Sequence, residues 1–279
     1  MGCSFYTRCR HLTDERLYAL YRHEIWYGSN ERKPLCRTER LDALQELANR
    51  AALKLNTEPC RVIAKPINGP RYGYYNAAEN AIIVNEHLIN NDELVINTKR
   101  GKRHCKEVFD ANAQLMDTVF HETFHAYQID VLMHPDKHPD ECRALQWKTN
   151  MLKGNYYSLE EDFLRYRIQH VEKSAFDHAE RQTAEVFENQ FAKDVGYQAY
   201  TEDIQKNSFE NVLEKAKQKY GKDVETAMYK FKLRFPDQPM TRESMYFNRY
   251  RTSASETSLS FDSLSIGLQQ PEEDGNSFS

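Results

Sequence analysis

The sequence predicts an α+β fold, in which a small sheet of three to four strands is followed by a mainly helical domain. Two observations support this fold class. Short β-branched and aromatic runs gather between residues 60 and 85, and apolar residues at three-to-four spacing recur before and after them. The 279 residues suffice for a sizeable core. We expect an N-terminal helical region at 1–58, an α+β domain at 59–235, and a flexible or disordered acidic, Ser-rich tail at 236–279.

Two helices are expected in the N-terminal region, at 12–27 and 39–56. The second carries an apolar stripe at helical spacing, formed by Leu41, Leu44, Leu47, Ala48 and Ala51. Such a stripe is the face that a helix buries against a core. The helix at 39–56 is therefore expected to pack against the rest of the protein.

The sheet is expected from three short segments, at 60–65, 71–75 and 81–85. Each contains Val, Ile or Tyr, the residue types that are enriched in strands. Residues 76–80 read Asn-Ala-Ala-Glu-Asn, which is typical of a turn and predicts a hairpin between the last two segments. The basic, Gly-containing stretch 99–106 is expected to be a loop.

From about residue 109 the apolar spacing becomes helical and largely stays so. Helices are expected at 109–130, 140–153, 158–168, 170–193 and 202–219. Gly154, Gly196 and Gly221 are expected to end helices, because glycine readily adopts the backbone conformation that follows a helix. From residue 252 onward, eight of 28 residues are Ser and few are large and apolar, which is typical of a disordered segment.

The net charge of −4 is concentrated at the C-terminal end of the chain. Residues 252–279 contain five acidic residues and no Lys or Arg, so this tail carries −5 and the rest about +1 (−4 + 5). A charge this small does not indicate a nucleic-acid groove or a surface for anionic membranes. We therefore expect neither nucleic acid nor membrane as a partner. The basic residues within 99–103 read as a solvated loop.

The compartment is inferred from the cysteines and from the apolar runs. No N-terminal run resembles a signal peptide, and no stretch approaches the roughly 18 apolar residues of a membrane span. The six cysteines are scattered without a Cys-x-x-Cys pair, which favours thiols in a reducing compartment. A cytoplasmic protein is expected, although the acidic tail leaves open export by a leaderless route. The oligomeric state stays open.

The segment from His121 to His125 reads His-Glu-Thr-Phe-His. Residues four apart on a helix stack on one face, so the imidazoles of His121 and His125 can both reach one metal ion at about 2.0–2.1 Å. Glu122 lies roughly 100° further around the helix, where it can take a proton from water at the ion's open position. The motif therefore predicts a Zn²⁺ site of the metallopeptidase type.

Two imidazoles alone hold zinc weakly, so a third protein ligand is expected downstream. The candidates are His134, His138, Glu160, Glu161, His170, Glu172, Asp177 and Glu180. Glu172 is favoured, because an apolar stripe on the same predicted helix can pack against the motif helix. In the alternative interpretation, Glu172 is an acid that stabilises a helix N-terminus. His134 and His138 lie in a Pro-rich loop and read as surface residues.

With this motif the chain resembles the zincin-type metallopeptidases, and among them the gluzincins, in which His-Glu-x-x-His is completed by a Glu on a later helix. The likeness runs from Tyr72 to about residue 187. It includes Gly-Tyr-Tyr-Asn at 73–76, followed by 81–85, which is similar to the strand beside the active cleft of small zincins. The strand at 81–85 could then pair with an extended substrate. The segment 166–176 departs from the family pattern at His170, where Pro is typical.

The motif and the resemblance together imply a zinc metallopeptidase whose substrate is a protein or peptide. Its catalytic domain would occupy 59–235, with His121, His125 and Glu172 as the zinc ligands.

The same chemistry assigns the other site residues. Glu122 would be the general base, and Tyr166 or His170 would donate to the oxyanion. Asp117 or Asp177 could orient a ligand imidazole by accepting its other N–H.

Two other interpretations stay open. The zincin scaffold could be a non-hydrolytic binding or effector protein with a structural zinc, although such a site needs no base at Glu122. Alternatively, the chain is a helical interaction protein in which the motif arises by chance, and it then holds no stoichiometric zinc after dialysis.

Overall fold

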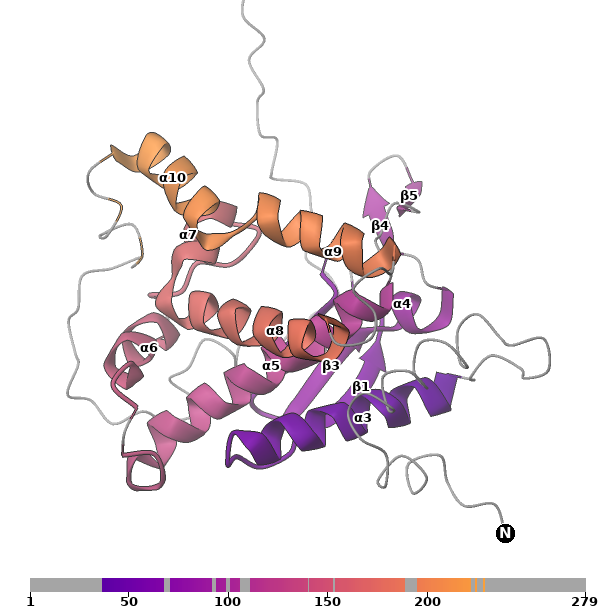
Figure 1. Cartoon of the computed structure of the whole chain (residues 1–279), viewed down its shortest axis with the longest axis horizontal. Helices are drawn as coiled ribbons and strands as arrows, with labels where there is room; N and C mark the ends of the chain where they lie inside the picture. Colours follow the sequence, from indigo (N-terminus) through magenta and orange to yellow (C-terminus); the bar gives the residue numbers. More distant parts are fainter. Residues whose placement is uncertain are drawn as a thin grey trace, which may run out of the picture. The chain divides into compact units, whose positions relative to one another are not determined.

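The computed structural model describes residues 37–67, 71–91, 94–98, 101–105, 111–139, 141–152, 154–188, 195–221, 224 and 228. The helix predicted at 12–27 and the tail predicted at 236–279 lie outside these residues. Within them, the fold is α+β, as predicted: a three-stranded sheet stands beside a mainly helical body (Figure 1).

The sheet consists of β1 (Arg61–Lys65), β2 (Gly73–Asn76) and β3 (Ala81–Asn85), in the order β1-β3-β2. Strand β3 pairs in parallel with β1 and antiparallel with β2. The turn predicted at 76–80 is observed at 77–80, where it joins β2 to β3. Asn80 has a φ of 44°, which Asn tolerates better than most residues. The three predicted strands and the turn are therefore confirmed.

Helix α3 (Arg37–Lys54) confirms the second predicted helix and buries most of the predicted apolar stripe. Gln45 joins this helix to β1, because its Oε1 accepts a hydrogen bond from Val62 N at 2.8 Å and its Nε2 donates to Cys60 O at 2.7 Å. A short helix that the sequence did not predict, α4 (Glu86–Asn91), follows the sheet.

Within the stretch 99–106, predicted to be a loop, residues 101–105 instead form a strand. Strand β4 (Leu94–Thr98) pairs antiparallel with β5 (Gly101–Cys105). The loop prediction was wrong because the polar, basic sequence of β5 has no apolar alternation, whereas backbone hydrogen bonds to β4 define the strand.

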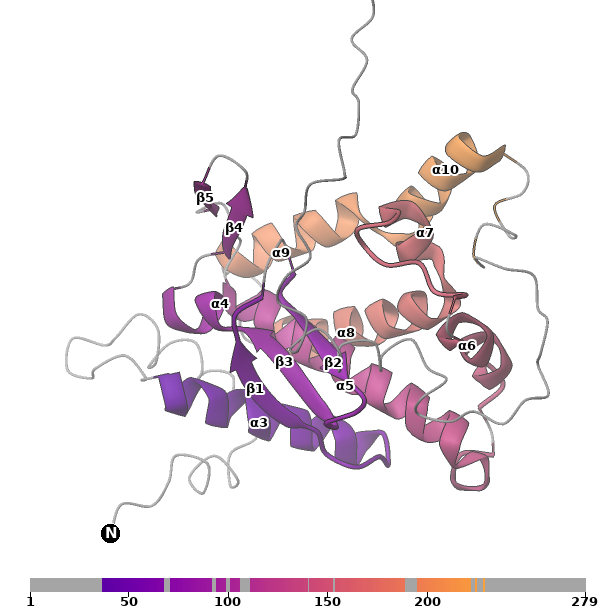
Figure 2. The same cartoon turned by 180° about the vertical axis from the view of Figure 1, so that it is seen from behind.

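Helix α5 (Ala111–Met133) carries the His-Glu-Thr-Phe-His motif and is buried along most of its length. It contacts α3, β2 and helix α8 (His170–Glu188). Figure 2 shows α3 and α5 on one face of the sheet, and α8 lies on the far side of α5 from the sheet. The motif therefore lies between the sheet and α8.

The packing of α8 against α5 follows the apolar stripe that the sequence predicted. Ala175 and Ala179 are fully buried, and the ring of Phe124 on α5 stacks on His178 at 4.6 Å. Trp147 on helix α6 (Ala144–Met151) adds an edge contact to Phe124 at 5.8 Å and donates from Nε1 to Ser174 Oγ at 3.1 Å. Helices α6 and α8 thus fix the position of the motif on α5.

Helix α7 (Phe163–Ile168) is shorter than the predicted 158–168. Its start is set by Asp162, whose side chain accepts a hydrogen bond from Arg165 N at 3.1 Å. The predicted stop at Gly154 follows α6, with a φ of 95°.

The helix predicted at 202–219 is two helices, α9 (Val195–Lys206) and α10 (Phe209–Tyr220). The break falls at Ser208, whose side chain accepts a hydrogen bond from Asn211 N and so starts a new helix. Gly196 lies within α9, so the prediction that it ends a helix is wrong. Gly221 does end α10, at a φ of 69°.

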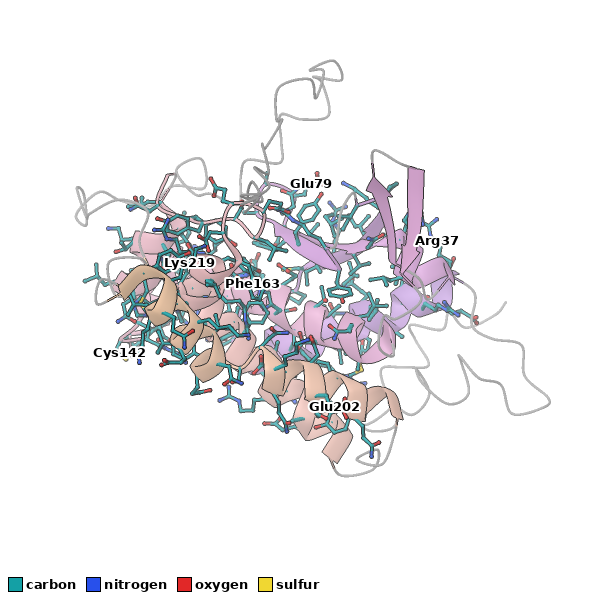
Figure 3. All side chains as sticks on the ribbon, turned by 90° about the horizontal axis from the view of Figure 1, so that it is seen from above. Arg37, Glu79, Cys142, Phe163, Glu202 and Lys219 are labelled. Atoms are coloured by element: carbon teal, nitrogen blue, oxygen red, sulfur yellow. The ribbon has the colours of Figure 1, made fainter. Side chains whose placement is uncertain are left out.

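Two cysteine side chains, those of Cys60 and Cys142, belong to the described part of the chain. Cys60 is buried and Cys142 is exposed in the turn before α6 (Figure 3), and both are free. A search of the described helices finds none with the length and apolar character needed to cross a bilayer.

Candidate metal centre

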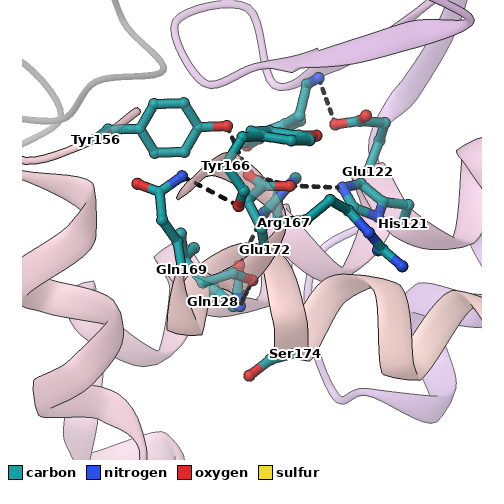
Figure 4. A network of polar contacts seen from close by, with 12 residues as sticks. His121, Glu122, Gln128, Tyr156, Tyr166, Arg167, Gln169, Glu172 and Ser174 are labelled. Carbon is teal, nitrogen blue, oxygen red and sulfur yellow. Dashed lines mark hydrogen bonds and ion pairs between the residues drawn. The ribbon is translucent and has the colours of Figure 1, made fainter. Parts of the chain in front are cut away.

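Helix α5 buries several polar side chains, which is unfavourable unless each finds a partner. Thr118 and Thr123 donate to the carbonyls of Gln114 and Val119 one turn earlier in the same helix, both at 2.7 Å. The remaining buried polar side chains of the motif turn are His121, Glu122, His125 and Gln128. Their partners come from α5 itself, from α8 and from β2 (Figure 4).

Three of the predicted residues converge. The Nε2 atoms of His121 and His125 are 3.0 Å apart. Glu172, in the first turn of α8, places Oε2 3.2 Å from His121 Nε2 and Oε1 3.4 Å from His125 Nε2. Among the described residues, these three form the one His, Cys, Asp or Glu group whose ligand atoms lie close enough together to hold a metal ion.

The spacing of these atoms matches a tetrahedral zinc site. Three ligand atoms that lie 2.0–2.1 Å from one zinc ion are about 3.3–3.4 Å from one another. The two Nε2 atoms are 3.0 Å apart, and each lies at about this distance from one of the two Glu172 oxygens, His121 Nε2 3.2 Å from Oε2 and His125 Nε2 3.4 Å from Oε1. In addition, Glu172 is fully buried and its Oε2 accepts no hydrogen bond from the described residues. A buried carboxylate oxygen without a donor is costly, and a cation would satisfy it. The three side chains therefore fit a divalent metal.

The charges of the cluster also favour a cation. Burial raises the pKa of Glu172, but the two histidines outweigh this and hold the pKa well below its usual value. Burial lowers the pKa of His125, but Glu172 and Glu122 outweigh this and raise the pKa to about 9. Glu172 is therefore negatively charged, and the site attracts positive charge, which a metal ion or a proton can provide.

Glu122 lies beside the three candidate ligands but is held separately. Its Oε2 accepts a hydrogen bond from the backbone N–H of Tyr75 on β2 at 2.7 Å. Strand β2 comes this close to α5 because residue 73 is Gly: a Cβ there would lie 2.7 Å from Thr118 Cγ2 on α5. The missing side chain of Gly73 thus lets the strand orient the predicted base.

Two tyrosines surround the Glu172 carboxylate. Tyr156, in the loop after α6, donates from its hydroxyl to Glu172 Oε1 at 2.6 Å. Tyr166 on α7 is half-buried, and burial together with the charges of Glu172 and Glu122 raises its pKa well above the usual value. Tyr166 therefore stays protonated and keeps an O–H donor beside the site (Figure 4).

His170, the other predicted oxyanion donor, begins α8. Its carbonyl accepts a hydrogen bond from Ser174 Oγ at 2.8 Å, and burial and Lys173 lower the pKa of its imidazole. These contacts do not connect it with the three candidate ligands, so its role stays a prediction.

The other acidic and histidine candidates for a third ligand have partners elsewhere. Glu160 pairs with Arg71, Asp177 with Lys173, and Glu180 with Arg167. His134 and His138 both contact Asp130 in the last turns of α5, at 2.7 and 3.1 Å. His134 is exposed, whereas the side chain of His138 is only 7% exposed, so the surface prediction holds for His134 alone.

Two predicted supporting roles are not seen. Asp117 accepts a hydrogen bond from Tyr200 at 2.7 Å, and Asp177 pairs with Lys173, while His121 Nδ1 has no hydrogen-bond partner among the described residues. Strand β3, the segment 81–85, pairs with β1 on one edge and β2 on the other, so it cannot pair with a substrate strand. The prediction for 81–85 was wrong because the edge strand beside α5 is β2.

Sequence reasoning missed two residues that contact the ligands. Gln128 accepts a hydrogen bond from His125 Nδ1 at 2.8 Å, and its position three residues after His125 on the same helix could have indicated it. Tyr156 lies in an irregular loop and has no such signal.

Comparison of the chain with protein-family models, with curated proteins and with solved structures finds no match. The functional interpretation therefore depends on the geometry of the site and on the chemistry of its residues.

Proposed function

We propose that the protein is a zinc-dependent hydrolase of peptide bonds, with His121, His125 and Glu172 as the zinc ligands. The observation that carries this proposal is the convergence of the two Nε2 atoms and the buried Glu172 carboxylate at 3.0–3.4 Å, with Glu172 Oε2 accepting no hydrogen bond from the residues that the structure describes. Two imidazoles and one carboxylate, with a fourth position open, make up the ligand set of catalytic rather than structural zinc sites.

The bound zinc would act as a Lewis acid that lowers the pKa of water and polarises a carbonyl group. Glu122 takes the proton of the attacking water and passes it to the amine that leaves. The hydrogen bond from Tyr75 N–H keeps Glu122 out of the ligand set and in one orientation. Tyr166, which stays protonated, donates to the oxygen that gains negative charge.

The position of Glu122 beside an edge strand favours an extended peptide as the substrate. Strand β2 has one strand neighbour, β3, in the part of the chain that the structure describes. Tyr75, whose N–H reaches Glu122, lies on this strand. A peptide that lies along the outer edge of β2 would therefore pass the proposed base.

The test is chelator-sensitive cleavage of a mixed peptide library by the wild type and by Glu122→Gln. The variant is expected to lose hydrolysis while it keeps about one zinc per chain, because Glu122 is not a ligand in this account. Glu46→Gln is the matched control, since Glu46 on α3 is 7% exposed against 8% for Glu122 and pairs with Arg50 away from the site. Full activity of Glu122→Gln would show that Glu122 is not the base.

The competing functions predict other results. A non-hydrolytic effector with a structural zinc would bind zinc and cleave no peptide. A purely structural ion pair between protonated His125 and Glu172 would keep no stoichiometric zinc after dialysis, because protonated imidazole does not bind metal.

A further inference from the structure

Gln128 is a fully buried amide that contacts both sides of the candidate metal centre. Its Oε1 lies 2.8 Å from His125 Nδ1, and its Nε2 donates to the carbonyl of Val171 at 2.9 Å. Val171 is the residue immediately before Glu172. One side chain of α5 therefore joins a candidate ligand on its own helix to the backbone beside the ligand of α8.

The orientation of this amide follows from the chemistry of its partners. The Val171 carbonyl can only accept a hydrogen bond, so the NH₂ group of Gln128 faces it and Oε1 faces His125. An amide oxygen can only accept, so His125 Nδ1 is the donor. In the neutral ring the proton then lies on Nδ1, and Nε2 has the free electron pair that a metal requires. This Nε2 is the atom that faces His121 and Glu172.

The hydrogen bond from Gln128 to the Val171 carbonyl acts on the other ligand, Glu172. Glu172 lies in the first turn of α8, where its backbone position depends on how this turn meets α5. Besides Gln128, Asn150 on α6 contacts Val171, where Asn150 Oδ1 accepts from Val171 N at 3.4 Å. The bond from Gln128 is shorter and comes directly from the helix that carries the motif.

The two histidine ligands differ in whether a hydrogen bond fixes the orientation of the ring. His125 is fixed through Gln128, whereas His121 Nδ1 is buried without a hydrogen-bond partner among the described residues. Edge contacts with the rings of Phe176, at 4.3 Å, and of His125 orient His121. Of the two imidazole ligands, His125 is the one that a hydrogen bond orients, and Gln128 provides this bond.

We propose that Gln128 is a positioning residue of the metal centre: it directs Nε2 of His125 into the cluster and holds the first turn of α8, and with it Glu172, in place. This inference deepens the proposed function and rests on it. Loss of such an outer hydrogen bond typically weakens metal binding by about 10–100-fold.

The test compares zinc dissociation constants, measured by competition with a chromophoric chelator, of the wild type, Gln128→Met and Gln128→Glu. Met keeps the length of the side chain and removes both hydrogen bonds, so zinc binding is expected to weaken about 10–100-fold. Glu still accepts from His125 but cannot donate to Val171, so Gln128→Glu is expected to bind zinc more tightly than Gln128→Met. The visible spectrum of bound Co²⁺ is expected to change in Gln128→Met, because one imidazole loses its fixed orientation.

Gln45→Met is the matched control. Gln45 also joins a helix to a neighbouring backbone through a carbonyl and an N–H, but it links α3 to β1 away from the cluster. It is expected to lower the melting temperature and leave both zinc affinity and the Co²⁺ spectrum unchanged.

Each outcome is decisive. A wild type that binds no zinc overturns the proposed function itself, and the role of Gln128 with it. A wild type that binds zinc, with Gln128→Met unchanged in affinity and spectrum or weakened only as much as Gln45→Met, overturns the role of Gln128 alone. If Gln128→Met does not fold, Gln128→Glu carries the test, since an affinity and a spectrum equal to those of Gln45→Met would then overturn the inference.

Discussion

Replacing Gly73 with Ala tests how closely strand β2 must approach the motif helix. A Cβ at this position would lie 2.7 Å from Ile83 O and 2.7 Å from Thr118 Cγ2. Ordinary van der Waals contact begins at 3.4 Å, so each separation must lengthen by about 0.7 Å (3.4 − 2.7). One contact is with the backbone of β3 and the other with a β-branched side chain of α5, so β2 has to shift relative to both elements.

The expected cost is that of overpacking a core, about 1–3 kcal/mol. At about 2–4 °C per kcal/mol for a domain of this size, the melting temperature should fall by about 2–12 °C. The same movement would stretch the 2.7 Å hydrogen bond from Tyr75 N to Glu122 Oε2. Hydrolysis should therefore fall in Gly73→Ala even where zinc content is unchanged.

The assay is thermal unfolding followed by fluorescence, together with peptide hydrolysis at saturating zinc. Gly221→Ala is the control, since Gly221 has a φ of 69° with no atom within 4 Å of a Cβ, so it tests backbone strain without crowding. In the Gly73→Ala protein, Thr118→Ser should restore part of the stability, because it removes the crowded methyl group and keeps the hydroxyl. A Gly73→Ala protein with the melting temperature and activity of the wild type would refute the close approach of β2 to α5.

Two further predictions concern the surroundings of the site. Tyr156→Phe removes the hydrogen bond to Glu172 Oε1 and should weaken zinc binding about tenfold or more in a chelator competition; an unchanged dissociation constant would show that Tyr156 does not support the ligand. Burial raises the pKa of Asp130, but hydrogen bonds from a lysine and two histidines of the following loop outweigh this and hold the pKa well below its usual value. The stability that Asp130 contributes is therefore present above the unfolded pKa of about 3.9 and is lost as the pH falls through the folded pKa. In urea titrations between about pH 5 and pH 2, the free energy of unfolding should fall more steeply for the wild type than for Asp130→Asn, and parallel curves would contradict the account.

The elements that local pattern specifies were predictable from the sequence. Helix α3, strand β3 and the motif helix α5 each bury a continuous apolar face or core, so their spacing is visible along the chain. Strands β1 and β2 are less buried, and their β-branched and aromatic residues indicated them instead. Strand β5 was missed because its polar, basic sequence has no apolar alternation, and its pairing with β4 depends on backbone hydrogen bonds. The break between α9 and α10 depends on a single capping serine, Ser208, within an otherwise helical pattern.

The residues of the candidate site also fall into two groups, those that a local sequence pattern predicts and those that depend on how distant segments pack. His121, Glu122 and His125 follow from helical spacing, and Glu172 follows from the apolar stripe that packs its helix against α5. The contact of Tyr75 with Glu122 could not be predicted, because it requires the relative position of a strand and a helix 47 residues apart. The contact of Tyr156 with Glu172 likewise depends on the path of an irregular loop.

The most direct test of the metal centre is anomalous diffraction at the zinc edge from crystals of the zinc-saturated chain. The account predicts one peak at about 2.0–2.1 Å from Nε2 of His121, Nε2 of His125 and a carboxylate oxygen of Glu172. Ordered side chains at these three positions with no peak between them would contradict it.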